Sequence, residues 1–241
     1  MKNNRKNLLL LNLALLAAAL MFFVSCKKSG EEVAALLSES EAAEIAETAI
    51  SDRSAGVAMP TIDATQIIES QLDNCNVPGD TSFQKSNSNA YATYNYTFGL
   101  EWLLTCNNLG VPQSASVEVN GNGSFSTTRW EGSDTATGNL TLTGLSPQEP
   151  AYLVNGTYTL TGDLTGDLRR VDPTFDCTTS ITLTNLSISK TTYAITGGTG
   201  TVTVTATNGQ GNTHTLNGTL LFNGDGTATV TVNGHTHTFT L

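Results

Sequence analysis

The chain has 241 residues, of which only 13% are charged, and a formal net charge of −10. A body this acidic repels nucleic acids and anionic lipid headgroups, so its composition excludes a nucleic-acid-binding role. The scarcity of charge and the 22 glycines favour short strands joined by turns, because helix surfaces are usually rich in Glu, Lys and Arg.

The N-terminus has the pattern of an export signal. A short basic segment, MKNNRKN, precedes an apolar run at 8–24 that is too short for a comfortable membrane span, which needs about 20 apolar residues. The run leads into FVSC, which resembles a bacterial lipobox, the signal for cleavage before a cysteine and acylation of that cysteine. We therefore predict that the signal peptide 1–25 is removed and that acylated Cys26 anchors the protein to a membrane. The alternatives are an ordinary cleaved signal and an uncleaved anchor.

The segment 26–58 is predicted to be a lipidated tether that contains an acidic helix. Within 31–55, Ser38 and Glu41 form the S-x-x-E pattern of a capping box. One face of this helix would carry only small or aliphatic side chains, namely Ala42, Ile45, Ala46 and Ala49. A face so weakly apolar predicts a helix that docks lightly or serves as a spacer.

A β domain is predicted for 59–241, and it opens with a second short helix. Pro60 is expected to end the tether region, and Asp63 is expected to cap a helix at 64–73. From about residue 81 apolar side chains alternate with threonine, the pattern of half-buried antiparallel strands with one wet face. We therefore predict a mainly β fold, an antiparallel up-and-down meander that closes as a barrel or a sandwich, preceded by one or two short N-terminal helices.

Four turns in the C-terminal part of the chain fix the expected strand register. Each turn lies between two alternating segments and contains residues typical of hairpin loops, such as Asn233–Gly234. All four turns keep the apolar side chains on one face, which supports the meander. The expected cross-strand pairs are Ile188 with Tyr193, Ala206 with His214, Phe222 with Ala228, and Val232 with His235.

The three histidines are the candidates for a metal site. His235 and His237 lie two residues apart in the last hairpin, and His214 lies upstream. In the expected register His214 is two strands and several residues from His235, which is ~9.5 Å across the sheet and ~13 Å along it. Zinc binds its ligand atoms at about 2 Å, so these residues are too far apart to share one ion. We expect structural histidines and no metal, with His235 and His237 as weak candidates.

A row of aromatic residues is the candidate for glycan binding. Tyr94, Tyr96 and Phe98 share one face of a predicted strand, and Trp102 and Trp130 follow. Each such ring buries roughly 150–250 Å² when it packs in a core, which is the favoured interpretation. The alternative is that Tyr94, Tyr96, Trp102 and Trp130 stack on sugar rings.

Three cysteines remain after Cys26. An exported chain folds in an oxidising compartment, so one disulfide is expected and one thiol is left over. We favour Cys75–Cys106, because this bond would tie the end of the second helix to the first long hairpin; Cys177 would then be free or used between chains. Three buried thiols are the alternative.

Few other motifs carry chemistry. SDTAT contains Thr135 in a pattern that resembles the Asp–Thr/Ser–apolar acceptor of O-glycosylation in Bacteroidota. The sequence contains none of the common signatures of a serine hydrolase, a zinc protease or a phosphate-binding loop. We therefore expect neither an enzyme nor a cofactor.

The whole chain resembles an uncharacterised family of exported lipoproteins of Bacteroidota. The resemblance is carried by FVSC, EAAEIAETAIS, YATYNYTFGLEWLLTCNN, YLVNGTYTLTG and LLFNGDGTATVTVNGHTHTFTL, in that order. It implies a location at the cell envelope, on the outer membrane, and no particular activity. Acidic residues soon after the acylated cysteine favour surface display in such proteins. Here CKKSGEE places lysines first, so the periplasmic and surface-facing orientations both stay open.

The functional expectation is a lipid-anchored cell-envelope β protein that is non-catalytic and acts by surface contacts. Its partners would be the membrane, through Cys26, and envelope glycans or proteins. One alternative is a glycan- or surface-binding module. The other is a metal-dependent activity at the C-terminal hairpin that carries His235 and His237.

Overall fold

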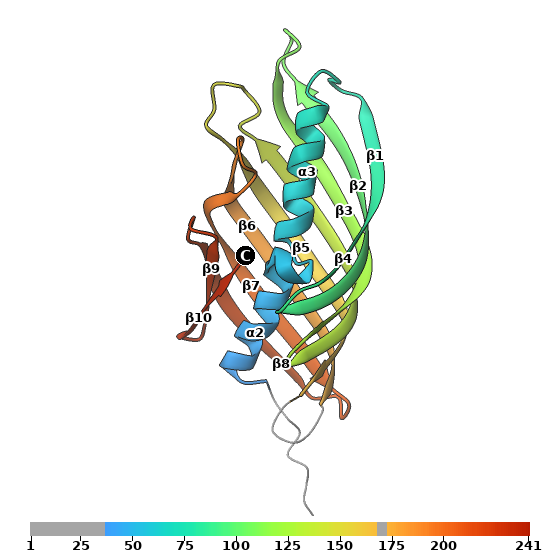
Figure 1. The fold of residues 1–241 in the computed structure, drawn as a ribbon, viewed down its shortest axis with the longest axis vertical. Helices are drawn as coiled ribbons and strands as arrows, with labels where there is room; N and C mark the ends of the chain where they lie inside the picture. The colour runs from blue at the N-terminus through green and yellow to red at the C-terminus, as the bar shows by residue number, and fades with distance from the viewer. Residues whose placement is uncertain (1–36, 168–172) are drawn as a thin grey trace, which may run out of the picture. The chain divides into compact units, whose positions relative to one another are not determined.

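The computed structural model describes residues 37–167 and 173–241, which lie within one compact unit (Figure 1). The predicted signal peptide and Cys26 lie outside the described residues. Two α-helices and a short 3-10 turn come first, and ten strands in one sheet follow. The predicted mainly β architecture with short N-terminal helices is therefore confirmed.

The sheet is an antiparallel meander in which the strands are ordered as they occur in the chain. β1 and β10 are its two edges and do not pair with each other, so the sheet is not closed into a barrel. The helical elements are α2 (Glu39–Ile50), η1 (Asp52–Ser54) and α3 (Ala58–Ser70). The strands are β1 (Pro78–Ser88), β2 (Ala92–Cys106), β3 (Pro112–Thr127), β4 (Trp130–Thr143), β5 (Ala151–Gly166), β6 (Thr174–Ser189), β7 (Ile195–Asn208), β8 (Thr213–Phe222), β9 (Thr227–Val232) and β10 (His235–Thr240).

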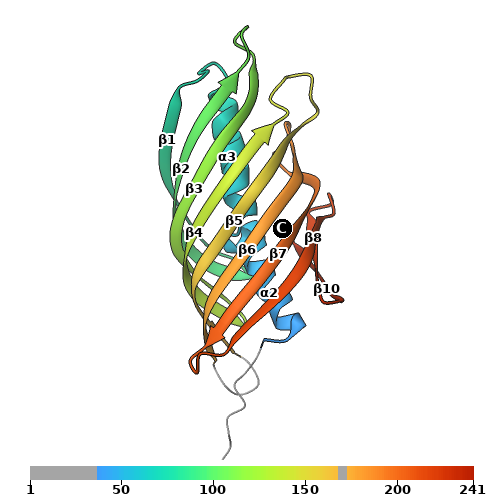
Figure 2. The same ribbon diagram turned by 180° about the vertical axis from the view of Figure 1, so that it is seen from behind.

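The two helices cover the inner face of the curved sheet, and they take the place that a second sheet would have in a sandwich. Figures 1 and 2 show this face and the opposite, outer face. The inner face carries the core, and in β9 the inward residues Ala228, Val230 and Val232 are buried while the threonines between them are partly exposed. The alternation seen in the sequence is therefore the division between core and outer surface.

α2 belongs to this core and is not part of a tether. The expected capping box of Ser38 and Glu41 is present at its N-terminus. Its small side chains let the helix approach the sheet closely, and its C-terminal half is also attached to β10 by polar contacts. Glu47 Oε2 lies 2.6 Å from His237 Nε2, and the Ser51 hydroxyl donates to the Thr240 carbonyl. The predicted light docking is therefore wrong, because all four residues of the expected face are buried: Ala42, Ile45, Ala46 and Ala49.

α3 begins at Ala58, earlier than the sequence predicts. Pro60 lies in its first turn, where the missing N–H costs no helical hydrogen bond. Asp63 does not cap the helix; its carboxylate forms an ion pair of 3.0 Å with Lys85 of β1. The prediction that Pro60 ends the region before the second helix was therefore wrong, because Pro60 lies inside α3.

Three of the four expected hairpin registers are confirmed, namely Ala206 opposite His214, Phe222 opposite Ala228, and Val232 opposite His235. The fourth is wrong, since Ile188 pairs with Ile195. This turn uses two more residues than a tight hairpin, and the Ser189 hydroxyl closes it by accepting from the backbone N–H groups of Thr191 and Thr192. Tyr193 completes the turn with a φ of 56°, in the left-handed region.

Glycines opposite aromatic rings shape the inner face. The directly paired residues are Trp102 with Gly79, Phe98 with Gly121, Tyr96 with Gly123, and Tyr158 with Gly138. A Cβ atom on Gly123 would lie 2.5 Å from the Tyr96 ring, so only glycine leaves room for that ring over the neighbouring strand. At these positions a large ring on one strand fills the space left by a glycine on the next strand. The glycines therefore let the core pack and let the sheet bend.

We expect Gly123→Ala to destabilise the fold by about 1–3 kcal/mol, because the added methyl group must displace the Tyr96 ring or the backbone of β2. The matched control is Gly209→Ala in the β7–β8 turn, where no atom lies within 4 Å of the new methyl group. Urea denaturation of both variants would measure the difference. Equal midpoints for the two variants would contradict the proposed steric role of Gly123.

Candidate functional site

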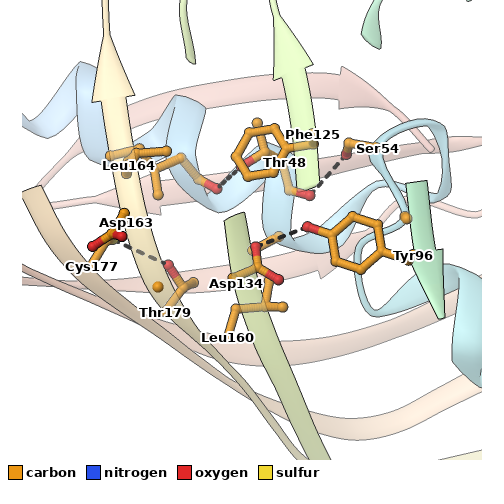
Figure 3. A pocket seen from close by; sticks show the side chains of 14 residues that line it. Thr48, Ser54, Tyr96, Phe125, Asp134, Leu160, Asp163, Leu164, Cys177 and Thr179 are labelled. Atoms are coloured by element: carbon orange, nitrogen blue, oxygen red, sulfur yellow. Dashed lines mark hydrogen bonds between the residues drawn. The ribbon is translucent and has the colours of Figure 1, made fainter. Parts of the chain in front are cut away.

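A small cavity, lined by both apolar and polar side chains, lies between α2 and the inner face of the sheet (Figure 3). Its volume is about 30 Å³, which is room for one or two water molecules. Thr48 and Ser54 line it from the helical side, and Asp134, Cys177 and Thr179 line it from β4 and β6. The buried carboxyl of Asp134 and the thiol of Cys177 both lie in this lining.

Asp134 is the central group of the cavity. The Tyr96 hydroxyl donates a hydrogen bond of 2.9 Å to Asp134 Oδ2, while the buried Oδ1 has no hydrogen-bond partner among the described residues. Burial raises the pKa of Asp134 to about 6, and the hydrogen bond from Tyr96 opposes this rise. Asp134 therefore changes its charge close to neutral pH.

The neighbours of Asp134 are not activated for chemistry. Burial raises the pKa of the Cys177 thiol to about 11, so the sulfur stays protonated and is a poor nucleophile. Burial also raises the pKa values of the Tyr96 and Tyr158 phenols, and the carboxyl of Asp134 adds to both rises. Within the described cavity, Asp134 can hold or release a proton but has no reactive partner beside it.

The position of Asp134 in the strand pattern is a sequence signal for this buried acid. Asp134 occupies an inward position of β4, with the same parity as Trp130, Ala136 and Leu140. A carboxyl group at an inward position of a strand is unusual, because burial without a partner destabilises its charged form. Its partner Tyr96 lies two strands away in the sheet, so the pair itself could not be read from local sequence.

The histidines do not converge. His237 contacts Glu47 of α2, His235 is exposed, and His214 lies on β8 with a buried Nδ1 that has no partner among the described residues. Across residues 37–167 and 173–241, no group of three His, Cys, Asp or Glu side chains is arranged to hold a metal ion. The contact between His237 and Glu47 attaches α2 to the sheet.

The aromatic candidates lie in or against the core. Tyr94, Tyr96 and Trp130 are buried, and Trp102 is partly buried against the core. The Trp130 indole also donates to Glu44 of α2. Stacking of sugars on the three buried rings is therefore ruled out, and only Trp102 keeps part of its surface in solvent.

Cys75 and Cys106 form a disulfide, in agreement with the favoured pairing, and Cys177 is a buried free thiol. The disulfide joins the segment before β1 to the end of β2. Thr135, the candidate for O-glycosylation, is exposed on the outer face of β4, where its hydroxyl donates to the Thr161 carbonyl.

The outer face is lined with hydroxyl groups in register. One cross-strand row runs from β5 to β10 through six threonines, namely Thr157, Thr182, Thr201, Thr219, Thr231 and Thr236. Hydroxyl pairs bridge neighbouring strands, as between Thr205 and Thr215 at 3.1 Å and between Thr229 and Thr238 at 2.9 Å. Such pairs stabilise the sheet by roughly 0.2–1 kcal/mol each.

The same row becomes acidic at the other side of the sheet. Asp80 of β1, Glu101 of β2 and Glu118 of β3 lie directly opposite one another and are exposed. None of them forms an ion pair with a described residue. We call these three residues the acidic row; like charges in this position destabilise a sheet.

An apolar patch lies next to the acidic row, where β1 begins, β2 ends and β3 begins. Its residues are Val77, Leu103, Leu109 and Val111, which we call the corner patch. They make up four of the six exposed large hydrophobic residues in the described part of the chain, and Leu109 at the hairpin tip is 87% exposed. A hollow lined by Leu103, Glu101 and Glu118 connects the corner patch to the acidic row.

Comparison of the chain with protein-family models, curated proteins and solved structures gives no match. Within the described residues, no helix is both long enough and apolar enough to cross a membrane.

We expect folding stability to fall as pH rises from about 4 through about 6, because the fold favours protonated Asp134. The raised pKa corresponds to a loss of up to about 3 kcal/mol above this window. Asp134→Asn keeps an acceptor for Tyr96 and cannot ionise, so it should be more stable than the wild type at pH 7.5 and equally stable at pH 3.5. Urea titrations at both pH values would test this, and a constant difference between the two proteins would contradict it.

We also expect Glu101→Gln to stabilise the protein by roughly 0.2–1 kcal/mol, because it removes the central charge of the acidic row. High salt should shrink the gain. Glu131→Gln is the control, because this exposed residue pairs with Ser126 and Thr165 and has no acid opposite. Thermal unfolding at low and high salt would compare them, and an equal gain in both variants would argue against repulsion in the row.

Proposed function

We propose that the protein is a lipid-anchored component of the cell envelope that acts without catalysis, through contacts made by the outer surface of its β unit. The anchor is acylated Cys26, and the outer membrane is the proposed destination. The FVSC motif supports the anchor, and the Cys75–Cys106 disulfide supports export, because disulfides persist in oxidising compartments.

The observation that carries this proposal is the separation between the two faces of the sheet. The inner face holds the aromatic rings, the thiol of Cys177 and Asp134, and α2 and α3 cover it. The outer face displays ordered rows of hydroxyl groups, the acidic row and the corner patch. Partners therefore meet a surface suited to binding, while the titratable groups of the interior are withdrawn from solvent.

A second candidate function is glycan binding, for which one hollow of the outer face provides the chemistry. Amide, hydroxyl and carboxylate groups line it, including Gln84, Asn95, Asn122 and Asp163. Such groups exchange hydrogen bonds with sugar hydroxyls. A glycan-array screen of wild type and Asn122→Ala would test it, and binding that the substitution leaves unchanged would place the glycan elsewhere.

We expect Cys26→Ser to move the protein from the membrane fraction to the soluble fraction, because the serine hydroxyl cannot receive the thioether lipid. Fractionation of cells followed by alkaline washing would measure the distribution. Cys177→Ser is the matched control and should stay in the membrane fraction, since that thiol is buried in the β unit. A Cys26→Ser protein that remains membrane-bound would overturn the lipid anchor.

A further inference from the structure

We propose that the corner patch and the acidic row together form a docking surface for an extended, basic segment of another envelope protein, in which apolar side chains alternate with Lys or Arg. The inference rests on the proposed function, since it names the class of partner for a surface that acts by contact. Three features of the described residues carry it: exposed apolar area, a rigid scaffold and an uncompensated charge.

The exposed apolar area is concentrated at one place. Leu109 and Val77 are 87% and 56% exposed, and Leu103 and Val111 lie beside them in the sequence or the strand register. Elsewhere in the described chain only Leu153 and Leu221 are comparably exposed, and they stand on β5 and β8. A concentrated apolar surface of this kind typically marks a protein contact.

The corner patch is held rigidly. The Asn107 side chain accepts hydrogen bonds from the backbone N–H groups of Leu109 and Val111, which fixes the hairpin tip. The Cys75–Cys106 disulfide and a backbone bond from Asn76 to Leu104 tie the segment before β1 to β2. A preformed surface loses little conformational entropy on binding, so each apolar contact contributes more to affinity.

The charge of the surface selects the partner. Asp80, Glu101 and Glu118 repel one another across three strands, and a row of Lys or Arg side chains would remove this repulsion. Anionic lipid headgroups would be repelled. A second copy of this chain would bring an identical acidic row and an equally acidic body. Charge complementarity therefore favours a basic protein segment over a membrane surface or self-association.

The position of the acidic row explains why the segment should be extended. The row runs across β1, β2 and β3, and the corner patch lies beside it, since Glu101 and Leu103 are both outward residues of β2. An extended segment that lies across these strands, between the row and the patch, has side chains that alternate to its two sides. Apolar side chains on one side would contact the corner patch, and basic side chains on the other would meet the acidic row. The lysine on β1, Lys85, faces inward and pairs with Asp63, so it does not oppose this charge.

The test measures binding of a blocked synthetic peptide, as long as β1, in which Leu and Lys alternate. Isothermal titration calorimetry with the full protein in neutral detergent would use this peptide and two matched peptides, one with Glu in place of Lys and one with Ser in place of Leu. We expect only the Leu–Lys peptide to bind, and its affinity to fall as salt increases. Binding of the Glu peptide with equal affinity, or no binding of the Leu–Lys peptide, would overturn the proposal.

Variants then locate the contact. We expect Leu109→Ser with Val111→Ser, and separately Glu101→Gln with Glu118→Gln, to weaken binding about tenfold or more. All four side chains are exposed, so the fold should survive, and circular dichroism would check this. Leu221→Ser is the control, because Leu221 is 48% exposed on β8. Equal affinity for wild type and both double variants would overturn the assignment to this surface.

A second copy of the chain or a lipid surface could bind the corner patch instead of the peptide, and each would give a different experimental result. Self-association in sedimentation experiments that Leu109→Ser with Val111→Ser abolishes would replace the proposed partner by a second copy. Loss of affinity for phosphatidylcholine vesicles in a Cys26→Ser background, caused by the same pair of substitutions, would replace it by a lipid surface. Peptide binding does not require the anchor, so the two proposals fail separately. A Cys26→Ser protein that stays membrane-bound would contradict the lipid anchor, and a Leu–Lys peptide that does not bind would contradict the docking surface.

Discussion

The close packing of α2 against the inner face of the sheet is the contact on which the rest of this structure depends. A sheet that is not closed into a barrel leaves its inner face open to water, and a hydrophobic face of that size must be covered. The alanines of α2 allow a short approach, and the Glu47–His237 contact attaches the helix to β10. The small residues that make the helix appear weakly apolar in sequence are the ones that let it fit.

The aromatic residues and glycines of the sheet complete this packing. Three of the large rings of β2, those of Tyr96, Phe98 and Trp102, lie opposite a glycine of a neighbouring strand, as Tyr96 does with Gly123. In this part of the core a large side chain therefore fills the space left by a glycine. The same arrangement leaves a small cavity beside Asp134, where a buried carboxyl makes stability depend on pH.

Separation of the two faces also assigns their roles. The thiol of Cys177 and the carboxyl of Asp134 are turned inward, while the outer face carries hydroxyl rows that change at β1–β3 into carboxylates beside an apolar corner. A like-charge row lowers stability, and exposed leucine and valine lower solubility, so neither is explained by folding alone. Both features become useful if this end of the sheet binds a basic, apolar partner.

Sequence alone determined the strands of the C-terminal meander, three of its four registers, the capping box at Ser38 and the separation of threonines from apolar residues. These features follow from local rules, because strand periodicity, turn residues and helix caps involve neighbours within a few positions. It also singled out the Cys75–Cys106 pairing from three choices, through the order of the elements.

Only the tertiary structure decided that the sheet stays open, that α2 is core rather than tether, and that Asp134 meets Tyr96 inside. It also decided that three acids from different strands form one row. Each of these depends on residues far apart in the chain, and their proximity is set by packing, by the length of a turn such as 190–193, and by the number of strands. A local pattern contains no information about those distances.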